Sequence, residues 1–210
     1  MKLRLFDYWR SSASYRVRIA LALKGVDYER VPVNLVAAEQ LSADNRARNP
    51  QGLVPTLEVD SVPITQSMAI IDWIDATYPH PPLYPTEPMA RAHTLSQAML
   101  IVADIHPIDN MRVLKRLETQ FGADQAAKDD WYRHWIATGF AALEQVAGAG
   151  PFLGGDAPGI ADLCLVPQMY NARRFALPLD AYPRLVAIDA AANALPAFAA
   201  AHPDAVKPAA

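Results

Sequence analysis

The feature that most constrains the fold is a change of pattern partway along the chain. The first eighty residues alternate strand-like and helix-like segments, and five prolines then fall within residues 79–88. Proline fixes φ and lacks a backbone N–H, so this stretch is expected to be a stiff, extended linker. Beyond it the strand signals largely stop. The sequence therefore predicts an α/β domain over residues 1–80, a proline-rich linker over 81–88 and an all-helical domain over 89–210.

The apolar periodicity gives the order of elements within each part. The first part is predicted to run strand, helix, strand, irregular segment, strand, strand, helix, with Gly25 at the C′ position that ends the first helix. Its strands are expected over 3–6, 28–33, 57–59 and 63–65, and its helices over 14–24 and 66–78. In the second part, helices are expected over 90–120 with a disturbance at Pro107, over 125–146, over 160–175, and over 184–201 with a break at Pro196.

Composition excludes several classes of partner. The 210 residues are 52% apolar and carry 19 basic against 22 acidic side chains, a net charge of −3, so we expect neither nucleic acid nor an anionic membrane surface as a partner. Lys2 and Arg4 interrupt the only early apolar run, so we expect no signal peptide. The sequence has no run of about 18 apolar residues, the length needed to cross a bilayer. The one cysteine, Cys164, lies in an apolar run typical of a core. With no signal peptide, no membrane span and no possible internal disulfide, we expect a cytoplasmic protein. The five histidines lack ligand spacing, so we expect no metal site.

Two adjacent hydroxyls, Ser11 and Ser12, stand where the first strand gives way to the first helix. The first N–H groups of a helix lack intrahelical partners and carry the positive end of its dipole, so such hydroxyls can help hold an anion, including the thiolate of a cofactor. Ser67 could bind a carboxylate in the same way at the next helix. Serine is also a common helix cap, and from these residues alone capping explains both positions at least as well. Pro55 either starts the following strand or, in the cis form, turns the Val54 backbone outward to pair with an extended peptide ligand.

Four blocks carry a resemblance to a known family: Tyr8–Ala20, Asn49–Leu57, Thr65–Ile71 and Ala161–Gln168. With them the chain resembles the glutathione transferases, and specifically their zeta class, the maleylacetoacetate and maleylpyruvate isomerases. The similarity covers nearly the whole chain. The serine block is specific to the class, whereas Val54–Pro55 and Gln66–Ser67 are shared across glutathione transferases.

The resemblance implies a thioredoxin-like N-terminal domain, an all-α C-terminal domain, glutathione as cofactor and a homodimer. It also implies a small dicarboxylic keto-acid substrate, because these isomerases convert a maleyl keto-acid to its fumaryl form in tyrosine or aromatic-compound catabolism. The sequence leaves open whether that substrate is maleylacetoacetate or maleylpyruvate. Two alternatives on the same scaffold are a glutathione-dependent dehalogenase or conjugating transferase, and a non-catalytic glutathione-fold binding protein.

Positions that match the family pattern also imply a role for each cofactor-binding residue. Ser11 matches the residue at the glutathione sulfur, and Ser12 is its neighbour in the same signature. His106 and Asn110, four apart and so expected on one helix face, resemble polar residues near the cofactor. The remaining matches are Gln40 at the glycyl end, Val54 before a cis-Pro55 along the peptide backbone, and Gln66 and Ser67 at the γ-glutamyl group.

Arginines are expected to hold the substrate carboxylates, because a planar guanidinium meets a carboxylate bidentately. Arg10 directly precedes Ser11 and is expected to act in catalysis with the serines. Arg174 matches the substrate-binding arginine of the family, and Arg112 resembles a third arginine of maleylpyruvate-type members. Arg16 and Arg18 are expected instead to be structural, in ion pairs or packed along their stems.

One departure from the class pattern bears on the mechanism. The zeta signature usually reads Ser-Ser-Cys, and here Ala13 stands at the third position. Transfer through an enzyme thiol is therefore disfavoured, whereas a borrowed thiolate can still add to the cis double bond, permit rotation and leave. Arg10 and Arg174 would stabilise the charge that develops. Asp162 matches the helix-capping motif of the family and is expected to serve folding, not catalysis.

Overall fold

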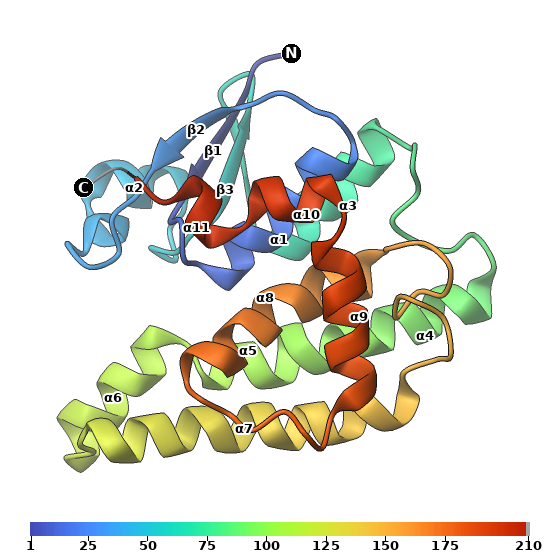
Figure 1. Ribbon diagram of the computed structural model, residues 1–210. Coiled ribbons are helices and arrows are strands. Elements are labelled where there is room, and N and C mark those ends of the chain that lie inside the picture. Colours follow the sequence, from blue (N-terminus) through green and yellow to red (C-terminus); the bar gives the residue numbers. More distant parts are fainter. Residues whose placement is uncertain (209–210) are drawn as a thin grey trace. The chain divides into compact units, whose positions relative to one another are not determined.

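The computed structural model describes residues 1–208, which fall into two compact units (Figure 1). The first unit combines residues 1–82 with the segment that begins at Ala194, and the second spans Leu83–Asn193. The first holds a four-stranded sheet with helices and the second is mostly helical, as the sequence predicts for the fold class. Among the described residues, no helix is both long enough and apolar enough to cross a membrane.

The sheet of the first unit has the strand order β2-β1-β3-β4. β1 and β2 are parallel, whereas β3 and β4 form the predicted antiparallel hairpin. Leu5 of β1 lies opposite Leu57 of β3, and both side chains are fully buried. The bounds are Leu3–Asp7 for β1, Glu29–Pro32 for β2, Thr56–Val59 for β3 and Val62–Thr65 for β4.

Helix α1 is central to the first unit because it packs against both α3 and α10. Its residues Val17 and Ile19 are fully buried, as are Ile70 and Ile74 of α3. Gly25 follows the C-cap of α1 with φ of +62°, as expected of a C′ residue. Two short helices, η1 and α2, occupy the segment predicted to be irregular, since so few residues give no apolar period. The bounds are α1 Ser12–Leu23, η1 Glu39–Leu41, α2 Ala43–Arg48, α3 Ser67–Thr77, α10 Pro196–Ala201 and α11 Pro203–Val206.

A buried carboxylate joins four parts of the first unit. Asp7, at the end of β1, is fully buried and forms ion pairs with Arg18 of α1 at 2.6 Å and with Arg30 of β2 at 2.7 Å. Both arginines also donate to carbonyls of the C-terminal segment, Arg18 to Ala201 at 3.1 Å and Arg30 to Val206. Burial lowers the pKa of Arg18, and the charge of Asp7 opposes that shift. The ion pair confirms the structural role predicted for Arg18.

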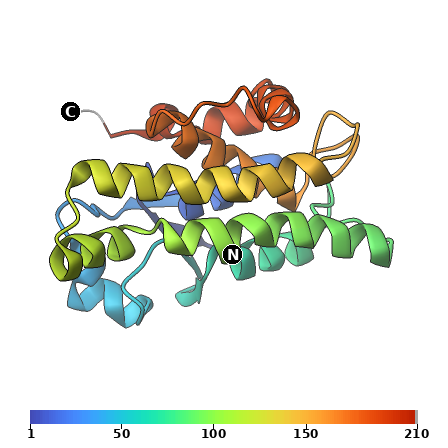
Figure 2. The same ribbon diagram turned by 90° about the horizontal axis from the view of Figure 1, so that it is seen from below.

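In the second unit a long helix, α7, runs beside an interrupted one. Figure 2 shows α7 alongside the arm made of α4, η2 and α6, and α8 packs against α4 and α9. Gly139 of α7 permits a close approach, because a Cβ at this position would lie 2.3 Å from Ile105 Cδ1 of η2. The bounds are α4 Pro88–Met99, η2 Leu100–Ile105, α5 His106–Ile108, α6 Met111–Phe121, α7 Gln125–Val146, α8 Ile160–Arg174 and α9 Pro183–Asn193.

The interrupted arm corrects one prediction. The single helix expected over 90–120 is divided into α4, the π-helical η2, α5 and α6. Pro107 lies in the first turn of α5, where a missing N–H is tolerated. The break follows at Asp109, and Asn110 then caps α6 by accepting from the backbone N–H of Arg112 at 3.1 Å. A capping side chain, which the apolar period does not reveal, therefore sets this boundary.

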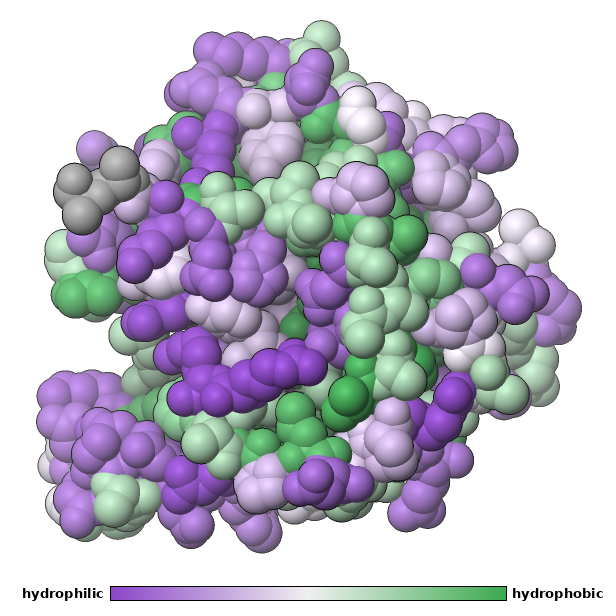
Figure 3. Space-filling view, viewed as in Figure 1, coloured by the Kyte–Doolittle hydropathy of each residue, from purple (hydrophilic) through white to green (hydrophobic). Residues whose placement is uncertain are grey.

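The alanine-rich region near the C-terminus forms two helices, and the break predicted at Pro196 is confirmed because α10 begins there. Helix α9 precedes it and shows as a band of hydrophobic colour in Figure 3. Its alanines are small, so this band follows from composition and does not require a large exposed apolar side chain.

Asp162 caps the start of α8 as expected. Its Oδ2 accepts from the Gly159 N–H at 2.9 Å and its Oδ1 from the Leu153 N–H at 2.8 Å, and the side chain is fully buried. Burial raises the pKa of Asp162, and the backbone N–H bonds oppose the shift. Cys164, two residues further along the same helix, is fully buried, which confirms its assignment to the core.

Replacing Asp162 with alanine should lower the free energy of unfolding by about 2–4 kcal/mol, because two buried N–H groups lose their acceptor. Urea unfolding followed by circular dichroism measures the change. Asp156→Ala, an exposed position in the preceding loop, is the control and should change stability by less than about 0.5 kcal/mol. Equal losses in the two variants would contradict the role assigned to Asp162.

Candidate functional site

The strand register brings several chain segments to one edge of the sheet. Phe6, near the end of β1, lies opposite Thr56 at the start of β3, and Thr56 lies opposite Thr65 at the end of β4. β2 ends at the same edge because Asp7 pairs with Pro32. Helix α1 follows β1 and helix α3 follows β4. Both helices therefore start from this edge, the place where open α/β sheets bind ligands.

Ser11 caps α1, which begins at Ser12, two residues earlier than predicted. Its Oγ accepts from the backbone N–H of Ser14 at 3.3 Å, so the capping interpretation is confirmed. A second role remains compatible with capping. Ser11 is only partly buried, lies at the positive end of the α1 dipole and keeps its hydroxyl hydrogen for another acceptor.

The start of α3 offers a second group of donors. Gln66 stands at the N-cap position with φ of +70°, an uncommon value for a non-glycine residue, and makes no side-chain capping bond. Its Nε2 instead donates to Gln51 Oε1 at 2.6 Å. Ser67 is the first residue of the helix and is buried, and its Oγ accepts from Arg16 NH1 at 3.3 Å. Sequence reasoning missed both Gln51 and the Arg16 contact, because each partner is distant in the chain.

Two further predicted cofactor residues belong to the same unit. The Val54–Pro55 peptide bond is cis, as the resemblance implies, and directly precedes β3 at the same sheet edge. Gln40 lies in η1, after β2, and its Oε1 is buried with no hydrogen-bond donor among residues 1–208. A buried acceptor without a donor is costly, so this atom fits the N–H group of a peptide-like ligand.

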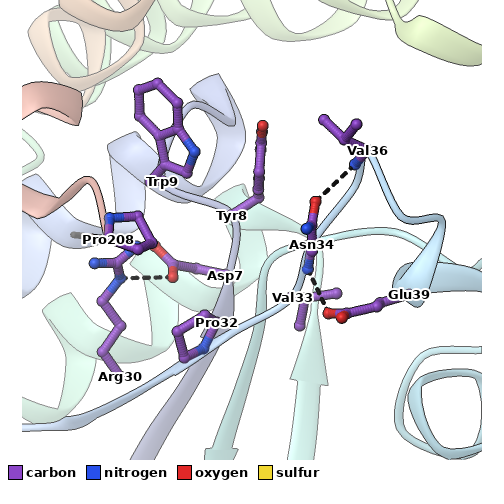
Figure 4. Close-up of a pocket in the computed structure, with 10 residues that line it drawn as sticks. All are labelled: Asp7, Tyr8, Trp9, Arg30, Pro32, Val33, Asn34, Val36, Glu39 and Pro208. Carbon is purple, nitrogen blue, oxygen red and sulfur yellow. Dashed lines mark hydrogen bonds and ion pairs between the residues drawn. The ribbon is translucent and has the colours of Figure 1, made fainter. Parts of the chain in front are cut away.

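A cavity of about 460 Å³ opens where β1 and β2 end. Figure 4 shows it bordered by Tyr8 and Trp9, which follow β1, and by Asn34 and Val36, which follow β2. Arg10, a predicted substrate residue, places its guanidinium 5.3 Å from the centroid of the Trp9 ring. The sequence did not identify Tyr8 and Trp9 as cavity walls, although both stand in the block that contains Ser11.

The predicted site residues of the second unit lie on three helices. His106 begins α5, whereas Asn110 caps α6 after the break, so they do not share one helix face as their spacing predicted. Arg112, in the first turn of α6, is exposed. Arg174, the last residue of α8, is also exposed, and its NH1 donates to Asn171 Oδ1 at 3.0 Å. Each arginine thus keeps an accessible guanidinium, as carboxylate binding requires.

Asp109 is a buried acid that the sequence analysis did not single out. Its side chain is 4% exposed, and neither carboxyl oxygen has a hydrogen-bond partner within the described chain. Desolvation raises its pKa to about 8, so the carboxyl keeps its proton at neutral pH. It is not part of a metal site, since residues 1–208 contain no group of three His, Cys, Asp or Glu side chains that could hold an ion.

Several known proteins are similar to this chain over nearly its whole length. The sequence family "Glutathione S-transferase, N-terminal domain" matches residues 1–76. The chain is 46% identical over 207 residues to maleylacetoacetate isomerase of Rhizobium meliloti (strain 1021), covering 97% of each protein. The holo structure of a maleylpyruvate isomerase, a bacterial glutathione S-transferase of the zeta class, superposes with a TM-score of 0.96 at 43% identity, over 99% of this chain and 100% of the other. Maleylacetoacetate isomerase from Anaeromyxobacter dehalogenans 2CP-1, with glutathione bound in its active site, gives a TM-score of 0.89 at 45% identity, over 100% and 98% of the chains.

The burial of Asp109 predicts a pH-dependent stability. Its pKa is higher in the folded state (about 8) than the ordinary value of 3.8, so the folded protein binds more protons between these limits. The protein therefore loses stability as pH rises through this range, by about 1.4 kcal/mol per pH unit for this group.

Asp109→Asn, which keeps the shape and cannot ionise, should remove that loss. In urea unfolding, the variant should gain stability relative to the wild type from pH 5 to pH 8. Asp104→Asn, at an exposed position on the same arm, should show no such gain. Stability curves that run parallel for Asp109→Asn and the wild type would contradict a buried, protonated carboxyl.

Proposed function

This chain belongs to the zeta class of the glutathione transferase family, and we propose that it catalyses the reaction of the isomerases in that class. The reaction is the glutathione-dependent conversion of maleylacetoacetate or maleylpyruvate to the fumaryl isomer. The sheet edge of the first unit is the observation from which we assign glutathione-binding roles to particular residues. Two helix N-termini, each with a serine, start from that edge on either side of the cis Val54–Pro55 bond.

This edge suits glutathione, an extended tripeptide with two carboxylates and a thiol. The sulfur is assigned to Ser11, with Ser12 beside it, and the γ-glutamyl carboxylate to the start of α3. The buried, unpaired Oε1 of Gln40 fits a peptide N–H towards the glycyl end. The remaining proposed contacts are the backbone of Val54, the side chains of Gln66 and Ser67, and His106 and Asn110 of the second unit.

Bound glutathione supplies a thiolate nucleophile for the cis double bond of the substrate. The Ser11 hydroxyl can donate a hydrogen bond to that sulfur, and the positive end of the α1 dipole favours its anionic form. Ala13 brings no second thiol to this helix start. Ser11 and the helix terminus therefore carry the activation.

The substrate has carboxylates and develops enolate charge, and arginine is the side chain suited to both. We assign Arg10, Arg112 and Arg174 to these anionic groups. Arg10 directly precedes the serines, and the guanidinium groups of Arg112 and Arg174 are accessible on the second unit.

We also propose that the protein acts as a homodimer in the cytoplasm, as the resemblance to its family implies. Light scattering of the purified protein should then give about twice the mass of one chain, which is 23.0 kDa. A mass equal to one chain would contradict the dimer.

Ser11→Ala should lower kcat by roughly 10²-fold, the usual effect of removing one donor to a reacting anion, and should cost only about 1 kcal/mol of stability as a lost cap. The loss of cis-enone absorbance of each keto-acid, with and without glutathione, measures turnover. Asp124→Ala removes a comparable cap from α7, where Oδ1 accepts from the Ala127 N–H at 2.8 Å, and should keep full turnover.

Each result that differs from these expectations would indicate a different mechanism or function. Unchanged kcat in Ser11→Ala would remove Ser11 from the mechanism. Turnover of chlorinated acids or aromatic electrophiles, with none of the maleyl keto-acids, would indicate a dehalogenase or conjugating transferase. Failure to bind glutathione in calorimetry would indicate a non-catalytic protein.

A further inference from the structure

Two arginines of α1 are among the largest fully buried side chains of the protein, and they meet different partners. Arg16 and Arg18 are each 1% exposed. Arg18 forms an ion pair with the buried carboxylate of Asp7. Arg16 instead donates from NH1 to the hydroxyl of Ser67, at the start of α3. The second contact lies at the functional edge of the sheet, so it can do more than hold two helices together.

The hydrogen bond from Arg16 fixes the polarity of the Ser67 hydroxyl. A guanidinium has only donors, so Ser67 Oγ must be the acceptor of this bond. The hydrogen of Ser67 is then available for a different acceptor. Ser67 is also the first residue of α3, an 11-residue helix whose first N–H groups have no intrahelical partner. The start of α3 therefore offers the Ser67 hydroxyl hydrogen and the first backbone N–H groups as donors, with a buried positive charge beside Ser67.

These donors at the start of α3 suit a carboxylate. An anion accepts from the hydroxyl and from the free N–H groups, and both the helix dipole and the guanidinium attract it. Burying a guanidinium is costly, and a well-packed apolar side chain in its place is often neutral or stabilising. An anion held at Ser67 would lie close to the Arg16 guanidinium, which already donates to the Ser67 hydroxyl.

We propose that Arg16 is a positioning residue for glutathione: it holds the Ser67 hydroxyl as a donor and stabilises the α-carboxylate of the γ-glutamyl group. This inference rests on the proposed placement of that group at Gln66–Ser67. It assigns Arg16 no contact with the thiol or the substrate. Its effect is confined to one carboxylate of the cofactor.

The test compares two ligands in calorimetry: glutathione, and γ-aminobutyryl-cysteinyl-glycine, which lacks only the α-carboxylate. The wild type should bind glutathione roughly 10- to 100-fold more tightly than the analogue, the range for hydrogen bonds to a charged group. Arg16→Met should reduce that preference about tenfold, by weakening glutathione binding and leaving analogue binding nearly unchanged. Arg4→Met, which removes an arginine paired with Glu58 in the same unit, should leave the preference intact.

A second pair of variants tests the route through Ser67. Ser67→Ala should reduce the preference as Arg16→Met does, and the double variant should lose little more than either single one. Arg16→Lys keeps the charge but loses the planar group, and should give an intermediate preference. If Arg16→Met does not fold, as thermal unfolding would reveal, Arg16→Lys and Ser67→Ala carry the test.

The contrary outcomes are separable. If the arginine variants weaken glutathione and the analogue equally while the wild type prefers glutathione, Arg16 serves only the scaffold and the proposal is wrong, although the γ-glutamyl placement stands. If the wild type shows no preference between the two ligands, the γ-glutamyl placement is wrong and the proposal fails with it.

Discussion

The buried carboxylate of Asp7 is the interaction on which the rest of the first unit depends. It lies where β1 ends, and its ion pairs with Arg18 and Arg30 join that strand to α1 and β2. Both arginines also bind carbonyls of the C-terminal segment, and Arg18 donates to the Trp9 carbonyl at 2.9 Å. Removing one member of such a buried cluster leaves an uncompensated charge, which is strongly destabilising. The short segment between Asp7 and the cap of α1 is thereby held at Asp7 and at the Trp9 carbonyl.

The candidate functional edge of the sheet, where α1 and α3 start, follows from that anchor and from the strand register. β1, β2 and β4 end where β3 begins, so segments that are distant in the sequence come together at this edge. A local sequence motif does not reveal such a meeting. Within this edge the two helix starts are built differently. Ser11 is partly exposed and bonded to its own helix, whereas Ser67 is buried and bonded to Arg16 of the neighbouring helix. The first arrangement suits a group that changes charge during reaction, and the second suits a group that stays anionic.

Most of the secondary structure could be predicted from the sequence, and the elements and contacts that could not be predicted have physical reasons. Periodicity and turn residues predicted the four strands, the start of α3 and the whole of α7. Periodicity missed α2 because it spans only six residues. It also predicted one helix over 90–120 disturbed at Pro107, whereas the helix ends after Ile108 and a new one begins at the Asn110 cap. Long-range contacts such as Arg16 to Ser67, and the desolvation of Asp109, depend on packing and leave no local signal.

The central claim is that Ser11 and the start of α1 activate a borrowed thiol without help from a neighbouring cysteine. The most direct measurement is the pH titration of the thiolate absorbance of glutathione bound to the wild type and to Ser11→Ala. The thiol pKa in the wild-type complex should lie well below that of an ordinary thiol, about 8.5, and should return towards that value in the variant. Titration of the bound thiol at the same pH in both proteins would contradict it.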